Sequence, residues 1–183
     1  MAAVNPKDAR DRSGPGTAGA EAVDGAASPV ARTLRRYKRI GLDTICFIYH
    51  LSKHPEYFPI TSELFRLIEQ GRFAAVTSSL ALVEILTRPQ QLGHHVAVEN
   101  YKVALATFPH LELRRSDIAI TEQAAALRAR YQLSTPEAVQ LATALVDGAE
   151  VFIGSTPALR KVREIEVLLL EDLRVSTVSG GGA

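Results

Sequence analysis

The feature that most constrains the fold is an apolar run, residues 39–51, that contains a single carboxylate. Ile40, Phe47 and Ile48 contribute to a β-branched and aromatic density that predicts a buried strand over the whole run. The carboxylate is Asp43, and burying its charge is costly unless it is paired or holds a metal. Two interpretations therefore remain open: Asp43 caps the turn after the strand, or it is a metal ligand.

Short apolar segments alternate with helical patterns along the rest of the chain. Further strands are predicted at residues 73–77, 111–114, 151–153 and 166–170, and helices are predicted between them. Strands that are mostly apolar and are separated by helices are typical of parallel sheets covered on both faces. We therefore expect an α/β fold, a three-layer αβα sandwich with a central, mostly parallel sheet.

The length of 183 residues and the hydrophobic fraction of 46% fit one domain with tails. The Ala/Gly/Ser/Pro-rich start predicts a disordered tail over residues 1–38, followed by a domain over 39–173 and a flexible tail over 174–183. A basic cluster in residues 32–39 is either a solvated entry segment or a surface facing nucleic acid. The net charge of +1 excludes neither interpretation.

Cysteine usage and hydropathy bear on the compartment. The single cysteine, Cys46, permits no intrachain disulfide, which fits a reducing compartment. No apolar run approaches the roughly 18 residues needed to span a bilayer, and the start has no secretory pattern. We therefore expect a cytoplasmic protein that does not associate with a membrane.

A second isolated carboxylate, Glu84, lies in a helix predicted from residue 80 to about 88, where Pro89 would end it. The helix is apolar nearly all round, which predicts that it is largely buried. Glu84 is then either part of a binding site or on a narrow solvent stripe, and its surroundings favour a site. The apolar residues are Leu80, Leu82, Val83, Ile85 and Leu86.

A third carboxylate, Glu137, lies in the first turn of a predicted helix over residues 137–146, with Thr135 as its N-cap. An acid there is favoured by the helix dipole alone, so Glu137 is weak evidence by itself. In a parallel sheet, however, functional groups gather at the carboxyl ends of the strands. Asp43, Glu84 and Glu137 could therefore converge on one hard cation, Mg²⁺ or Mn²⁺, which prefers oxygen ligands.

The folded part of the chain, about residues 39–173, resembles the PIN domain family and, within it, toxin ribonucleases of the VapC type. Any one of the matching segments is a weak signal, and their common order and spacing make the resemblance fairly specific. The segments are residues 42–44 (LDT), 47–51 (FIYHL), 78–86 (SSLALVEIL), 133–145 (LSTPEAVQLATAL) and 151–159 (VFIGSTPAL).

The resemblance implies a metal-dependent endoribonuclease of a toxin–antitoxin system that cleaves RNA phosphodiester bonds. It implies Mg²⁺ or Mn²⁺ as cofactor, with Asp43 and Glu84 as the first two ligands and Glu137 where the family usually has Asp. It also implies a homodimer, and often a small antitoxin whose C-terminal segment wraps the dimer and blocks the site.

The sequence departs from the family pattern around this site. Ile45 replaces a small polar residue, and Glu137 reaches one methylene further than Asp. Gly154-Ser155-Thr156 stands where the family usually carries a Thr-Asn-Asp-like triplet, so the neutral Thr156 replaces a fourth acid. The hydroxyls of Thr44, Ser155 and Thr156 are predicted to support the site.

These departures leave more than one function open. The first is the active nuclease, with Asp43, Glu84 and Glu137 as catalytic metal ligands. The second is a PIN-fold protein with weak or lost catalysis that acts as an RNA-binding or regulatory partner. The third, an α/β protein whose acids are only caps and surface groups, is less favoured.

Overall fold

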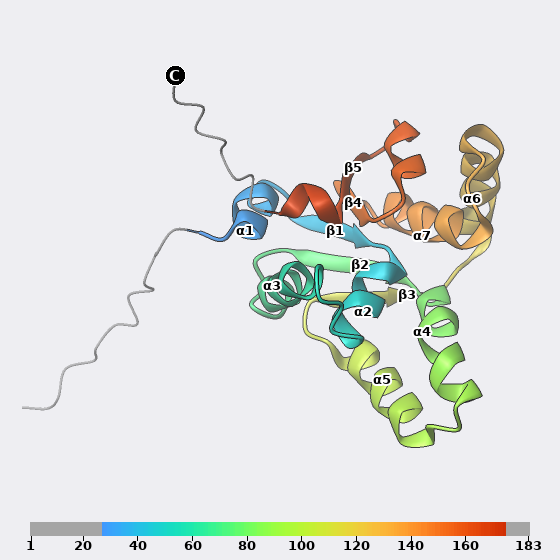
Figure 1. Ribbon diagram of the computed structural model, residues 1–183. Helices are drawn as coiled ribbons and strands as arrows, with labels where there is room; N and C mark the ends of the chain where they lie inside the picture. Colours follow the sequence, from blue (N-terminus) through green and yellow to red (C-terminus); the bar gives the residue numbers. More distant parts are fainter. Residues whose placement is uncertain (1–26, 175–183) are drawn as a thin grey trace, which may run out of the picture.

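The computed structural model describes residues 27–174, which form a five-stranded sheet in the order β3-β2-β1-β4-β5 (Figure 1). All four strand pairs are parallel, with β1 at the centre. The expected α/β class and parallel sheet are therefore confirmed. The strands are β1 (Arg39–Leu42), β2 (Ala74–Ser78), β3 (Leu111–Arg114), β4 (Val151–Gly154) and β5 (Glu166–Leu169).

Helices cover both faces of the sheet and give the expected three layers. On one face, Leu64 and Ile68 belong to a core that joins α1, α2 and α3 to the sheet. On the other face, Leu127 and Leu141 pack α6 and α7 against Phe152. The helices are α1 (Pro29–Leu34), α2 (Thr44–Leu51), α3 (Phe58–Glu69), α4 (Leu80–Gln91), α5 (His95–Thr107), α6 (Ile118–Tyr131) and α7 (Thr135–Val146), with short 3₁₀ helices η1 (Pro157–Lys161) and η2 (Leu170–Leu173).

The prediction that residues 39–51 form one strand is wrong. The strand β1 ends at Leu42, and α2 begins at Thr44 with Asp43 as its N-cap. The carboxylate of Asp43 accepts a hydrogen bond from the Ile45 backbone N–H, as an N-cap does. Because a buried helix and a buried strand can both be continuously apolar, hydrophobic density alone does not separate them.

The folded unit begins earlier than residue 39. Within the expected tail, α1 is capped by Ser28, and it buries Val30 and Leu34 completely or nearly so. Tyr37 is buried as well. The remainder of that tail, residues 1–26, and residues 175–183 of the expected C-terminal tail lie outside the described residues.

Several helix ends differ from the predictions by one turn or less. Helix α3 begins at Phe58, after Tyr57 at its N-cap position. Helix α4 continues through Pro89 to Gln91, and the N-cap of α7 is Ser134 rather than Thr135. Pro89 has no N–H to donate to the Ile85 carbonyl, so the helix passes through it with one backbone hydrogen bond fewer.

Helix α7 lies directly on the central strand because Gly41 has no side chain. A Cβ placed on Gly41 would lie only 2.4 Å from the Cβ of Ala144 and 2.9 Å from a ring carbon of Phe152. This close approach fixes the height of α7 above the sheet. In residues 27–174, no helix has the length and apolar character needed to cross a membrane.

Candidate functional site

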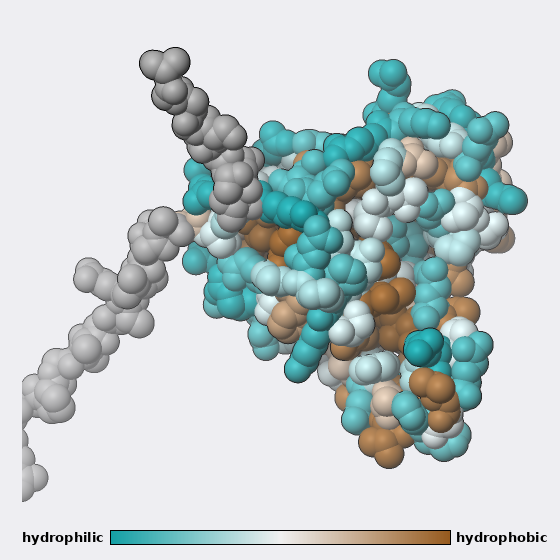
Figure 2. Space-filling model, viewed as in Figure 1, coloured by the Kyte–Doolittle hydropathy of each residue, from teal (hydrophilic) through white to brown (hydrophobic). Residues whose placement is uncertain are grey.

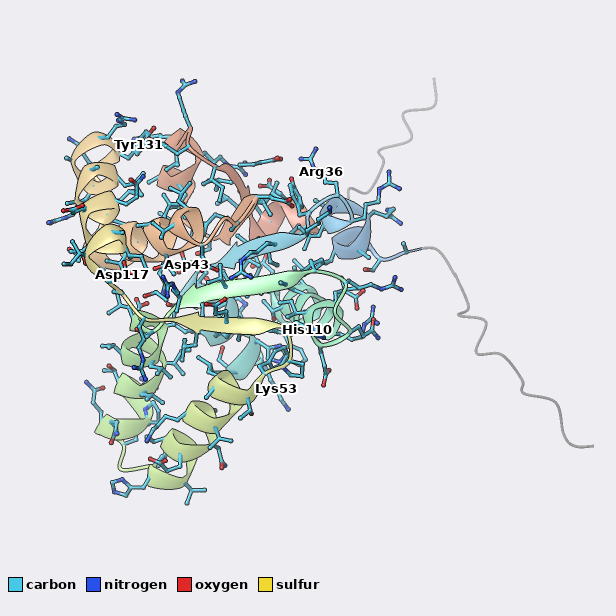
Figure 3. The ribbon with its side chains drawn as sticks, turned by 180° about the vertical axis from the view of Figure 1, so that it is seen from behind. Arg36, Asp43, Lys53, His110, Asp117 and Tyr131 are labelled. Carbon is cyan, nitrogen blue, oxygen red and sulfur yellow. The ribbon has the colours of Figure 1, made fainter. Side chains whose placement is uncertain are left out.

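Asp43 lies at the carboxyl end of the central strand, between the α7 side and the α4 side of the sheet (Figure 3). Its backbone N–H donates to Ile153 O at 2.9 Å, and its half-buried carboxylate accepts from Ile45 N at 3.3 Å. Burial raises the pKa of the Asp43 carboxyl to about 6, and the negative charges of Glu84 and Glu137 add to the increase. The position therefore gathers negative charge around a carboxylate that is partly removed from water.

Glu84 is connected to the carboxyl end of β1 through Thr44, the residue that follows Asp43. The buried Thr44 hydroxyl donates to Glu84 Oε2 at 2.6 Å, so the residue next to Asp43 binds the second acid. The prediction of a largely buried helix around Glu84 is wrong, because Glu84 is exposed and Val83 is 61% exposed. Helix α4 buries one narrow stripe and otherwise extends away from the sheet beside α5 (Figure 1).

Glu137 is bound at the start of its own helix. Its Oε2 accepts from the backbone N–H of Ser134 at 2.9 Å and from the Ser134 hydroxyl at 2.7 Å, which forms a capping box. Burial raises the pKa of the Glu137 carboxyl, but hydrogen bonds from Ser134 and Thr156 outweigh it and leave the pKa below its usual value. Glu137 is therefore a stable anion that is already hydrogen-bonded.

The turn after β4 brings Gly154, Ser155 and Thr156 to the same end of the sheet. The Thr156 hydroxyl lies near enough to Glu137 to help lower the pKa of its carboxyl, and Ser155 is half-buried. A Cβ on Gly154 would lie 3.2 Å from Asp43 Oδ2, so the glycine backbone lies against the Asp43 carboxylate. Thr156 therefore provides a neutral hydroxyl at the position where the family resemblance implies a fourth acid.

One site residue, Gln140, was missed by the sequence analysis. It is 1% exposed, and its Nε2 donates to Thr44 Oγ1 at 2.6 Å. Its Oε1 accepts from Thr77 Oγ1 at 3.1 Å and from the Ser78 backbone N–H at 3.0 Å. A signal was present, since Gln140 follows Glu137 by three residues on the same face of a mostly apolar helix.

The donor set fits a hard cation held by two carboxylates. Among residues 27–174, no group of three His, Cys, Asp or Glu side chains is placed to hold a metal ion together. Asp43 and Glu84 nevertheless carry carboxylate oxygens next to Thr44, and Mg²⁺ is commonly bound by one or two carboxylates with waters and phosphates. Glu137 does not complete such a site while it accepts from Ser134.

The basic cluster in residues 32–39 lies away from these acids. Arg39 is at the amino end of β1, where it forms ion pairs with Glu112 and Asp147. Arg36 pairs with Glu166 at 2.5 Å. These pairings favour the interpretation of this cluster as an entry segment, since Asp43 lies at the opposite end of the strand.

The PIN domain family matches residues 40–165, more than half of the chain. The chain therefore belongs to the PIN domain family, whose α/β fold the structure shows.

Two solved structures share this fold. A toxin–antitoxin complex from Klebsiella pneumoniae aligns with a TM-score of 0.55 and 18% identity over 72% of this chain and 97% of that chain. VapBC2 from Rickettsia felis, bound to a DNA fragment from its promoter, aligns with a TM-score of 0.57 and 14% identity over 72% of this chain and 98% of that chain. No curated protein matches the sequence.

Proposed function

We propose that this protein is a toxin-type PIN ribonuclease that cleaves RNA phosphodiester bonds with Mg²⁺ or Mn²⁺ held by Asp43 and Glu84. The observation that carries the proposal is the Asp43 carboxylate, which is desolvated at the carboxyl end of the central strand and lies in the field of two further acids. Such an arrangement destabilises the ionised site, and a divalent cation relieves that destabilisation.

The protein's own groups orient the two carboxylates. The Ile45 N–H donates to the Asp43 carboxylate, and the hydroxyl of the next residue, Thr44, donates to Glu84. A bound divalent ion would supply positive charge that polarises a phosphate of the RNA. Glu137 contributes negative charge from the capping box and would need to leave Ser134 to become a third ligand.

We further propose that the protein acts in the cytoplasm as a homodimer and is held in check by a small antitoxin. The two structural neighbours support the antitoxin, since one is described as a toxin–antitoxin complex and the other as VapBC2. An apolar surface on α4 and α5 also supports a protein partner (Figure 2). Its exposed residues are Val83, Leu92, Val96 and Val103.

A second candidate function is a PIN protein whose catalysis is weak and which binds RNA or regulates a partner. The capped Glu137 and the neutral Thr156 favour it, because both lower the number of carboxylates free to bind a cation. Affinity for a hard cation falls as the charge of the ligand set falls.

The test is cleavage of a mixed RNA pool by purified protein with Mg²⁺ or Mn²⁺. Wild type is compared with Asp43→Asn, Thr156→Asp and, as a control, Asp117→Asn, an exposed cap of α6. If the protein is a nuclease, wild type and Asp117→Asn cleave the RNA and Asp43→Asn does not. Activity only in Thr156→Asp would support the second candidate. Inactivity of all four, with no Mn²⁺ binding, would show that the cation site is wrong.

A further inference from the structure

We propose that Gln140 is a positioning residue of the cation site, and that it holds Glu84 in place through the hydroxyl of Thr44. This inference rests on the proposed function, in which Glu84 is a cation ligand. The three residues come from three different helices, and the structure joins them by two hydrogen bonds of 2.6 Å.

The direction of each hydrogen bond follows from the groups involved. The backbone N–H of Ser78 can only donate, so the amide atom facing it is the oxygen Oε1 of Gln140. The nitrogen Nε2 must then face Thr44, and it donates to the Thr44 hydroxyl oxygen. The single hydrogen of that hydroxyl is left for Glu84, whose ionised carboxylate can only accept.

Burial makes this arrangement rigid. Thr44, Gln140 and Thr77 are each 1% exposed, and Ser78 is fully buried, so water does not compete for these groups. The Thr77 hydroxyl shares its single hydrogen between Gln140 Oε1 at 3.1 Å and Leu42 O at 2.9 Å, so the Ser78 N–H is the fixed donor to Oε1. The amide orientation is therefore fixed by the ends of β1 and β2.

Glu84 needs such a fixed partner because its own helix does not restrain it. Its side chain is exposed and has several rotatable bonds, so a free Glu84 would sample many orientations. The hydrogen bond from Thr44 restricts these orientations to those near Asp43. Ordering a ligand in advance strengthens cation binding because less entropy is lost when the ion arrives.

The experiment measures Mn²⁺ affinity by calorimetry on wild type, Gln140→Leu, Thr44→Val, the double variant and Thr44→Ser. We expect Gln140→Leu and Thr44→Val each to weaken Mn²⁺ binding about tenfold or more. The double variant should bind no more weakly than the worse single variant, because both changes break the same connection. Thr44→Ser keeps the hydroxyl and should retain affinity.

The matched control is Thr143→Val, which removes a buried hydroxyl from the same helix. Thr143 is fully buried and donates only within α7, to Val139 O at 2.7 Å, so its loss should change stability without changing Mn²⁺ affinity. If Gln140→Leu does not fold, Gln140→Glu replaces it. The new carboxylate still accepts from Ser78 but draws the Thr44 hydrogen away from Glu84, so the same loss is expected.

Two results would overturn the inference while the proposed function stands. One is unchanged Mn²⁺ affinity in folded Gln140→Leu, when wild type binds Mn²⁺ and Asp43→Asn does not. The other is an additive loss in the double variant, which would show that Gln140 does not act through Thr44. If wild type itself binds no Mn²⁺, the proposed function fails, and the role of Gln140 fails with it.

Discussion

Ser134 donates both its backbone N–H and its hydroxyl to one oxygen, Oε2, of Glu137. Ser134 is also the N-cap of α7, because its hydroxyl oxygen accepts from the backbone N–H of Glu137. The same residue therefore caps the helix and holds the side chain of the third acid of the candidate site. The same carboxylate cannot serve the helix start and a cation equally well. In the proposed cation site, helix capping and cation binding would therefore compete for Glu137.

We predict that Ser134→Ala raises Mn²⁺ affinity several-fold, because Glu137 loses the hydroxyl donor of residue 134 and keeps only its backbone N–H. The change should also lower the free energy of unfolding by about 1 kcal/mol through loss of the N-cap. Calorimetric titration and urea unfolding measure the two effects. The control is Ser28→Ala at the cap of α1, which should lower stability without a gain in affinity. Equal Mn²⁺ affinity in Ser134→Ala and wild type would contradict this competition.

The raised pKa of Asp43 predicts a stability that depends on pH. The folded pKa is about 6 and the ordinary value is 3.8, so the folded chain binds more protons between these values. Stability therefore falls as pH rises through this window, and the full penalty applies above about pH 6. We predict that Asp43→Asn stabilises the metal-free protein at pH 7.5 by up to about 3 kcal/mol and not at pH 4.

Urea unfolding in the presence of a chelator measures this difference at both pH values. Asn remains a good N-cap for α2, so loss of the cap does not obscure the result. An equal effect of Asp43→Asn at pH 4 and pH 7.5 would show that the carboxylate is not destabilised by its surroundings.

Gly154→Ala should disturb the site through its new methyl group. The added carbon would lie 2.7 Å from Leu159 Cδ1 and 3.2 Å from Asp43 Oδ2, and Leu159 is fully buried. We predict a loss of about 1–3 kcal/mol in stability together with weaker Mn²⁺ binding, both measurable on one preparation.

Gly148→Ala is the control for this prediction. Gly148 has a positive φ of 72° and open space around it, so alanine there costs stability by strain alone. It should leave Mn²⁺ affinity unchanged. If the two alanine variants bind Mn²⁺ equally well, the contact between Gly154 and Asp43 has no bearing on the site.

Leu34→Ala tests whether α1 is part of the folded domain. Leu34 is fully buried in the core that α1 shares with α3 and η2. We predict a loss of about 2–5 kcal/mol in the free energy of unfolding, as for other buried leucines. Thermal unfolding beside Val96→Ala, a change at a residue that is 76% exposed, provides the comparison. A similar small effect of both changes would contradict this placement of α1.

Most strands of the sheet could be predicted from the sequence because each is a short apolar run between turn residues. It failed at residues 39–51, where α2 continues the apolar run of β1 without a change of hydrophobicity. It also failed for α1, whose two buried residues, Val30 and Leu34, are too few to produce a visible period. Both errors arise where tertiary burial, rather than local pattern, decides the structure.

The candidate site was predicted in part. Asp43 and Glu84 were found because a carboxylate within an apolar run demands a reason, and the structure places both beside Thr44. Gln140 was missed because a neutral amide in a helix draws no attention until its buried partners are known. The orientation of Glu137 depends on Ser134, one residue before the predicted cap.

The close packing of α7 against Gly41 makes the positions of Glu137 and Gln140 depend on residues far from the acids. Glu137 and Gln140 lie on the same helix as Ala144, whose Cβ fills the space above Gly41. A single methyl group added at Gly41 or at Ala144 would shift α7, and Glu137 and Gln140 would move with it. No acidic residue of the sequence would have changed. The proposed capacity to bind a cation would therefore depend partly on small volumes in the core, which a count of carboxylates does not report.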